Sequence, residues 1–273
     1  GHVILTTRFP VFVVGSARSG TTAMASALLG IGYHGFREGN FLPLIASINQ
    51  EVDRHFATFS KGGHKTLVSL VDQAALKSSI AAVLAFCEAQ LNPMAPWLDK
   101  SGNHTMIEAI PYLLETWPEA VFIFSKRRGI ENIISRLKKF PTHNFEYHCK
   151  DWARIMKAWR DARTKLDRRI YLEIDQQMLI TAPTSASDRL AKFLNLSDTQ
   201  RDDLGAIFTK ARPQETSDGS ASRVYALDTL WTETQCGIFQ DICGPEMEAF
   251  GYSNDESYWQ KAEQIAPETP QQL

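Results

Sequence analysis

Residues 9–22 read Phe9-Pro10-Val11-Phe12-Val13-Val14-Gly15-Ser16-Ala17-Arg18-Ser19-Gly20-Thr21-Thr22, and this stretch decides the fold. Its first half is apolar and rich in β-branched residues, which is typical of a strand buried on both faces. A run of good helix formers follows over residues 23–29 and ends at Gly30. A strand, a loop of small residues and a helix in this order predict a phosphate-binding turn.

The rest of the chain alternates strands with helices. Further strands are predicted at 96–100, 120–125 and 169–174. Helices are predicted over 41–60, 65–91, 106–117, 146–166 and 187–196, and Ile130, Ile133, Ile134 and Leu137 form a helical apolar stripe. This alternation predicts an α/β fold with a central parallel sheet flanked by helices. No linker or internal repeat divides the chain, so we expect one domain over 1–273 with a core of about 9–252. The segment 212–222 is expected to be a mobile loop, and the polar residues from about 260 onward to fray.

Composition excludes several classes of protein. The chain has 273 residues, a formal net charge of −2 and 44 % hydrophobic residues, which argues against general disorder and against a dedicated nucleic-acid binder. No stretch has the length of apolar sequence that a membrane span needs. The four cysteines form no C-x-x-C pair, so we expect reduced thiols and a cytoplasmic protein. Gly1-His2 resembles a remnant of tag removal.

The loop after the first strand has the chemistry of an anion site. Gly15 and Gly20 have the glycine spacing of a P-loop, but Thr21 stands where nucleotide-hydrolysing versions have lysine. Backbone N–H groups converge in such a turn, and the start of the helix adds partial positive charge. Arg18 supplies a full charge, and Thr21 and Thr22 supply hydroxyls. The alternative is a capped helix that binds nothing, because serine and threonine are common N-caps.

Arg18-Ser19-Gly20-Thr21-Thr22 after a buried strand resembles the 5′-phosphosulfate-binding loop of the sulfotransferases that use 3′-phosphoadenosine 5′-phosphosulfate (PAPS). Ala17 replaces the usual proline of that loop, and the arginine resembles the bacterial and carbohydrate-modifying branches. The resemblance implies a P-loop-like three-layer fold and one sulfotransferase-like domain. It also implies that PAPS, with PAP as the product, is bound by Ser16, Ala17, Arg18, Ser19, Gly20, Thr21 and Thr22.

A second motif also resembles the sulfotransferases that use PAPS. These enzymes carry an arginine after a core strand and a serine eight positions later, which together hold the 3′-phosphate; Arg127 and Ser135 have this spacing. An arginine at the carboxyl end of a parallel strand points into the crevice where such sheets bind ligands. The neighbouring basic residues have a second interpretation as a solvated helix face, above all Lys138 and Lys139. In the late loop, the resemblance assigns Arg223 to the 3′-phosphate, with Arg212 close by in the sequence.

Weaker matches follow in the family's order. The segment 97–101 resembles its Lys-Ser-Pro segment, with Gly102 in place of proline, which would put Lys100 near the transferred sulfuryl group. Residues 171–175, 191–196 and 231–252 resemble the family's late strand, a helix end and the closing helix. The resemblance therefore covers roughly residues 10–252.

The reaction implied is in-line transfer of a sulfuryl group to a hydroxyl of a sugar, lipid or small-molecule alcohol. Arg18, Lys100 and the loop amides would position and stabilise charge. The general base is expected to be Glu38, after the glycine-rich turn at Gly35, with His104 as the second candidate; alternatively, Glu38 only pairs with a surface cation. Residues expected near the acceptor are Tyr33, His34, Phe36 and Phe41, and core packing is an equally good explanation for the two phenylalanines.

No metal is required for this reaction, and His143, His148 and Cys149 are interpreted as the start of a surface helix rather than a ligand set. Two other functions stay open. A P-loop kinase or nucleotide hydrolase would need a lysine before Thr22 and an acidic Mg²⁺ ligand. A non-catalytic nucleotide-binding module would bind through the same basic crevice without transfer. The sequence predicts no nucleic-acid partner and leaves the oligomeric state open.

Overall fold

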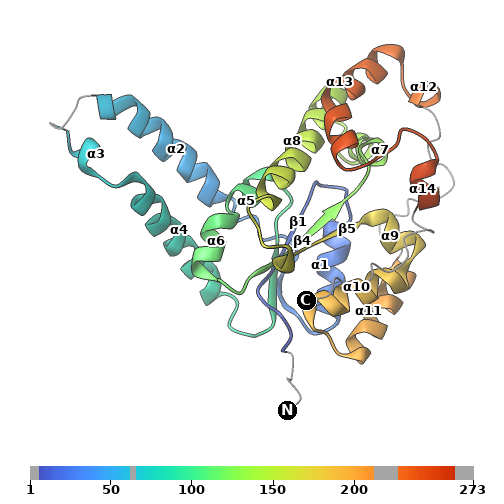
Figure 1. Cartoon of the computed structure of the whole chain (residues 1–273), viewed down its shortest axis with the longest axis horizontal. Coiled ribbons are helices and arrows are strands. Elements are labelled where there is room, and N and C mark those ends of the chain that lie inside the picture. The colour runs from blue at the N-terminus through green and yellow to red at the C-terminus, as the bar shows by residue number, and fades with distance from the viewer. Residues whose placement is uncertain (1–5, 62–65, 212–226, 262–273) are drawn as a thin grey trace.

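A five-stranded parallel sheet forms the centre of the molecule (Figure 1). The computed structural model describes residues 6–61, 66–211 and 227–261. The strand order is β2-β3-β1-β4-β5. The strands are β1 (Val11–Val14), β2 (His34–Phe36), β3 (Trp97–Lys100), β4 (Val121–Lys126) and β5 (Tyr171–Asp175). The four predicted strands are confirmed, and the α/β class with them.

The edge strand β2 is the one that the sequence does not predict. Its residues His34, Gly35 and Phe36 are all exposed, so no apolar run or alternation marks them. Hydrogen bonds to β3 alone make this segment a strand, where the sequence pattern indicated a glycine-rich turn. A Cβ at Gly35 would lie 2.0 Å from the carbonyl oxygen of Leu98, so only glycine permits the close approach.

Fourteen α-helices are described, in addition to a 3₁₀ turn at Arg168–Ile170. They are α1 (Thr21–Gly30), α2 (Leu44–Phe59), α3 (Leu67–Leu70), α4 (Gln73–Gln90), α5 (His104–Glu108), α6 (Ile110–Thr116), α7 (Gly129–Lys139), α8 (Phe145–Arg163), α9 (Gln176–Thr181), α10 (Pro183–Leu194), α11 (Asp198–Ala211), α12 (Leu227–Leu230), α13 (Glu233–Ala249) and α14 (Ser257–Lys261). The predicted helix 106–117 is two helices that meet at Ala109, because Pro111 starts a new helix. The segments 65–91 and 187–196 correspond to α3 with α4, and to α10.

Helices cover both faces of the sheet, which makes the three layers of a P-loop-like fold. On β1 the side chains alternate: Val11 and Val13 pack against α1, α9, α10 and α11, whereas Phe12 and Val14 pack towards α5, α6, α7, α8 and α13. Both clusters are buried and apolar. The sheet is therefore covered on each side, as the continuous apolar sequence of β1 and β4 predicts.

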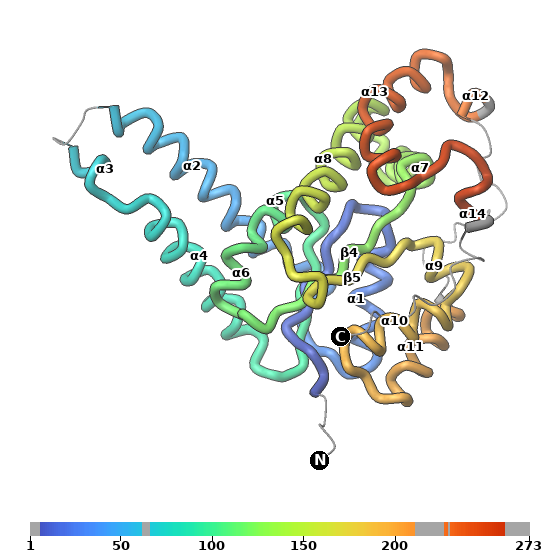
Figure 2. Tube along the Cα trace, viewed as in Figure 1, coloured from blue at the N-terminus to red at the C-terminus, as the bar shows by residue number. Residues whose placement is uncertain are grey.

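The helices α2 and α4 extend away from the sheet as a pair (Figure 2). Their inner ends pack on α5 and α6, and their apolar residues include the exposed Phe59 and Phe86. Among the described residues, no helix has the length and apolar character to cross a membrane. The four cysteines are free thiols.

Because all five strands are parallel, their carboxyl ends meet at one edge of the sheet. β1 ends in the loop 15–20, β3 ends at Lys100, β4 leads into Arg127 and β5 ends at Asp175. This edge is where open parallel sheets bind their ligands.

Candidate active site

The loop 15–20 is a tight turn that brings β1 into α1. Arg18 and Gly20 have left-handed backbone conformations, with φ of 68° and 79°, and the Ser19 N–H donates to the Ser16 carbonyl oxygen at 3.1 Å. Gly15 has φ of 150°, and a Cβ there would lie 2.2 Å from the carbonyl oxygen of Ser125 on β4. The loop thus lies directly against the end of β4, which leaves no room for a side chain at Gly15.

Side chains from α7 and β4 form hydrogen bonds that hold this loop in place. The Asn132 amide donates to the Ala17 carbonyl oxygen and to the Ser19 hydroxyl, both at 2.9 Å. The Ser125 hydroxyl donates to the Ser19 carbonyl oxygen at 2.8 Å. Asn132 and Ser125 are supports that the sequence analysis missed. The only indication in the sequence was that Ser125 lies on the strand, and Asn132 on the helix, of the second motif.

Arg136 adds a charged support. Its guanidinium donates to the Ser16 hydroxyl and to Asn132 Oδ1, and forms an ion pair with Asp151 at 2.6 Å. Ser16 and Ser19 are among the loop residues expected to bind the ligand, and their hydroxyls are both engaged in holding the loop. The buried Thr21 packs its methyl group against Gly15.

The two arginines of the two motifs lie side by side. Arg18 Nε donates to the Ser135 hydroxyl at 2.8 Å, and Arg127 donates to the Arg18 carbonyl oxygen at 3.0 Å. Burial lowers the pKa of both guanidiniums, and the Arg18 charge further lowers the pKa of Arg127. Two guanidiniums in one partly dry site repel each other, so the arrangement favours a bound anion. The Ser135 oxygen accepts from Arg18, which leaves its hydroxyl hydrogen able to donate.

The other basic residues of α7 divide between interior and surface. Arg128 and Arg136 are buried and paired with Glu131 and Asp151, so the interpretation as a solvated face is wrong for them. Lys138 and Lys139 are exposed, as that interpretation predicts.

Lys100, Glu38 and Thr22 form the other part of the site. The Lys100 ammonium makes an ion pair with Glu38 and donates to the Thr22 hydroxyl at 3.2 Å. That hydroxyl also lies 3.5 Å from Glu38 Oε1. The Lys100 side chain is 6 % exposed and that of Glu38 is 56 % exposed. The sheet edge therefore places a buried cation and an accessible carboxylate beside the first turn of α1.

The turn that carries Glu38 is fixed against β3. The Gly39 N–H donates to the Lys100 carbonyl oxygen at 2.9 Å, and a Cβ at Gly39 would lie 1.8 Å from a carboxyl oxygen of Asp99. Asp99 is buried on the face of β3 opposite to that of its neighbour Lys100, and it lies next to the Glu88 carboxyl of α4. Burial, together with hydrogen bonding and charge from Asp99, raises the pKa of Glu88 to about 10, so this pair holds a proton at neutral pH.

His104 begins α5 and makes no hydrogen bond to any described residue of this site. Tyr33, expected near the acceptor, is instead buried in the α1 layer, and its hydroxyl donates to the Arg8 carbonyl oxygen at 2.7 Å. Phe36 is exposed at the edge strand, next to the exposed His34, whereas Phe41 packs against the core.

Two further predictions concern residues away from these contacts. Arg212, Arg223 and the loop 212–222 lie outside the described residues, as does the tail from 262 onward. His148 and Cys149 lie near the start of α8, so the predicted helix start is confirmed. Both residues are fully buried, so the prediction that they lie on the surface is wrong. Throughout the described ranges, no group of three or more histidine, cysteine, aspartate or glutamate residues is arranged to hold a metal ion.

A parallel sheet whose first strand turns through a glycine-bounded loop into a helix, with an arginine at the end of the neighbouring strand, defines a P-loop-like α/β protein. The chain belongs to the sulfotransferase family, whose model matches residues 10–200. Family and fold together support sulfotransfer as the general activity.

Solved sulfotransferase structures share this fold. The sulfotransferase STF9 from Mycobacterium avium is 12 % identical with a TM-score of 0.56, over 92 % of this chain and 79 % of that one. Mouse sulfotransferase SULT7A1, in complex with PAP, is 12 % identical with a TM-score of 0.52, over 93 % and 87 %. The sulfotransferase domain from the curacin biosynthetic pathway is 19 % identical with a TM-score of 0.50, over 97 % and 94 %. No curated protein sequence matches the chain.

Proposed function

We propose that this protein transfers the sulfuryl group of PAPS to an acceptor hydroxyl on a sugar, lipid or small-molecule alcohol, without a metal. The observation that carries the proposal is the convergence of the two motifs: Arg127 donates to the backbone of Arg18, and Arg18 donates to Ser135. The proposal treats the chain as one sulfotransferase-like domain with its core over about 9–252, of the bacterial or carbohydrate-modifying type.

The donor would be held at two places. The backbone N–H groups of the loop 16–22, the start of α1 and the Arg18 side chain suit the 5′-phosphosulfate. Arg127 and Ser135 suit the 3′-phosphate, because a buried guanidinium and a free hydroxyl hydrogen can both donate to it. Arg18 also bonds Ser135, so the two phosphate positions share one continuous network.

The residues near Thr22 suit the transfer step. When bound, PAPS supplies a sulfuryl group on a phosphosulfate anhydride. Glu38 accepts the proton of the acceptor hydroxyl as its oxygen forms the new bond to sulfur. The bond between sulfur and the 5′-phosphate oxygen breaks, and Lys100 and the loop amides stabilise the charge left on that oxygen. The ion pair with Lys100 holds the Glu38 carboxylate at this position before the acceptor arrives.

Ligand selection tests the proposal. We expect PAP and PAPS to bind the wild-type protein and raise its melting temperature more than Mg-ATP does. Arg127→Ala should weaken PAP binding by about 10- to 100-fold in titration calorimetry, because a charge-assisted contact to phosphate is lost. Lys139→Ala, which removes an exposed cation at the end of the helix that follows Arg127, is the matched control.

Three outcomes would contradict the proposal. A preference for Mg-ATP would favour a kinase or nucleotide hydrolase. PAP binding without sulfuryl transfer to any member of a broad acceptor panel would favour a non-catalytic module. Equal PAP affinity in Arg127→Ala and Lys139→Ala would remove Arg127 from the donor site.

A further inference from the structure

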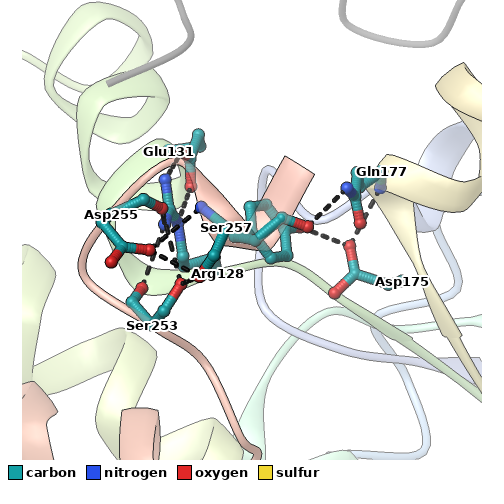
Figure 3. A network of polar contacts seen from close by, with 8 residues as sticks. Arg128, Glu131, Asp175, Gln177, Ser253, Asp255 and Ser257 are labelled. Atoms are coloured by element: carbon teal, nitrogen blue, oxygen red, sulfur yellow. Dashed lines mark hydrogen bonds and ion pairs between the residues drawn. The ribbon is translucent and has the colours of Figure 1, made fainter. Parts of the chain in front are cut away.

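Arg128, the neighbour of Arg127, is 0 % exposed and binds the chain's C-terminal part (Figure 3). One of its terminal nitrogens donates to the carbonyl oxygens of Ser253 at 3.0 Å and Asp255 at 2.6 Å. The rest of the guanidinium bonds the buried Glu131 carboxylate, with Nε at 2.8 Å. A buried charge needs this full set of partners. The start of α7 and the segment 252–258 are therefore held together by one guanidinium.

A second anchor for the same segment is Asp175, at the carboxyl end of β5. Its two carboxylate oxygens accept hydrogen bonds from the Tyr252 hydroxyl at 2.7 Å and the Tyr258 hydroxyl at 2.6 Å. The Gln177 amide donates to the Tyr258 carbonyl oxygen at 2.8 Å. The Tyr258 ring is buried, and its centroid lies 4.5 Å from the Arg128 guanidinium carbon. Tyr258 therefore contacts both anchors, and we call residues 252–258 the C-terminal clasp.

Both anchors adjoin the nucleotide site. Arg128 is the next residue after Arg127, whose pKa is lowered by burial and raised in part by the nearby carboxylate charges of Glu131 and Asp175. On the other side, Gln176 follows Asp175, is buried, and has its Cγ 3.2 Å from where a Cβ on Gly20 would lie. The clasp thus supports the backbone that carries Arg127 and, through α9, the end of the loop at Gly20.

We propose that docking of the C-terminal clasp on Arg128 and Asp175 positions Arg127 and the loop for the donor, with Tyr258 and Asp175 as positioning residues. This inference rests on the proposed function of the same site. Because coupling between two sites is reciprocal, a nucleotide that binds the ordered site also stabilises the docked clasp. The acceptor side, at Glu38 and Lys100, lies at β2 and β3 and has no described contact with the clasp.

The test removes single hydroxyls. Tyr258→Phe keeps the ring and its contact with Arg128 but loses the bond to Asp175; Tyr252→Phe/Tyr258→Phe loses both bonds. We expect about 10-fold weaker PAP binding in the double variant and a matching rise in KM for PAPS, with kcat at saturating PAPS within about twofold of wild type. The control is Tyr147→Phe, an exposed tyrosine on α8, which should change neither quantity.

Hydrogen exchange gives a second measurement, made on the wild-type protein and on the double variant. Saturating PAP should slow amide exchange across 252–261, and should not slow it in the double variant to the same extent. Unchanged PAP affinity in the double variant would overturn the proposed role of the clasp, and so would amide exchange rates over 252–261 that do not change when PAP is added. Neither result would contradict the use of PAPS. If wild-type protein does not bind PAP, both the proposed function and the clasp are wrong.

Discussion

Arg18 Nε lies 2.8 Å from the Ser135 hydroxyl oxygen, although 117 residues separate the two. One residue belongs to the loop after β1 and the other to the second turn of α7, after β4. β1 and β4 are hydrogen-bonded neighbours in parallel register, so the loop after β1 and the helix after β4 lie at the same sheet edge. The hydrogen bond makes the two motifs of the sequence parts of one site.

Ser135→Ala removes the acceptor of the Arg18 hydrogen bond. We expect PAP affinity to fall about fivefold, since a hydrogen bond of this kind contributes about 1 kcal/mol and Arg18 also loses its orientation. Titration calorimetry measures the effect. Ser79→Ala, on the exposed surface of α4, is the control, and equal affinities in the two variants would exclude Ser135 from the donor site.

Glu38→Gln removes the proposed proton acceptor but keeps the shape of the side chain. We expect kcat to fall by at least about 100-fold, the usual contribution of a general base, while PAP affinity stays within about twofold. Sulfuryl transfer to an active acceptor and PAP titration give the two numbers. Turnover close to that of the wild type would reject Glu38 as the base, and His104→Ala would then be measured.

Gly15→Ala and Gly237→Ala differ in the space available for the added methyl group. At Gly15 the new methyl group would lie 2.2 Å from the Ser125 carbonyl oxygen, so the loop must move. We expect a loss of about 1–3 kcal/mol in the free energy of unfolding, together with weaker PAP binding. At Gly237, on α13, nothing lies within 4 Å, and alanine should stabilise by about 0.5–1 kcal/mol. Urea unfolding compares them, and equal effects would contradict the loop geometry.

Glu88→Gln tests the buried carboxyl pair beneath β3. In the folded protein the pKa of Glu88 is about 10, against an ordinary value of 4.5. Between these values the folded state binds more protons than the unfolded state, so the free energy of unfolding falls as pH rises, by at most about 1.4 kcal/mol per pH unit. The variant lacks this contribution, so its stability relative to wild type should rise from pH 6 to pH 9.

Urea unfolding at several pH values measures this difference. Glu248→Gln, an exposed position on α13, controls for the loss of a surface charge. Parallel curves of stability against pH for wild type and Glu88→Gln would show that Glu88 does not hold a proton in the folded protein.

Local signals predicted most of the fold. β1 and β4 are continuous apolar strands, and burial on both faces selects such sequences, so periodicity and composition identify them. β2 carries no such signal, because a three-residue edge strand is defined by its partner and not by its own side chains. The break at Ala109 between α5 and α6 was readable in principle from Pro111, which suits the first turn of a new helix.

The site was partly predictable for the same reason. The residues 15–20 form one local turn, and Arg127 and Ser135 have a fixed spacing from a strand end into a helix, so the sequence by itself predicted residues that the structure brings together around Arg18. The pairing of Lys100 with Glu38, the support of the loop by Asn132 and Arg136, and the burial of Tyr33 join elements far apart along the chain.

The sequence determined a parallel α/β protein with a glycine-bounded loop between its first strand and first helix, because strand burial, glycine spacing and helix starts act within a few residues of one another. The tertiary structure decided that Arg18 forms a hydrogen bond with Ser135 and that Glu38 forms an ion pair with Lys100. It also decided that Tyr252 and Tyr258 both donate hydrogen bonds to the carboxylate of Asp175. Strand order and helix packing determine these contacts, because side-chain atoms on separate elements come within hydrogen-bonding distance only after the whole sheet has been assembled.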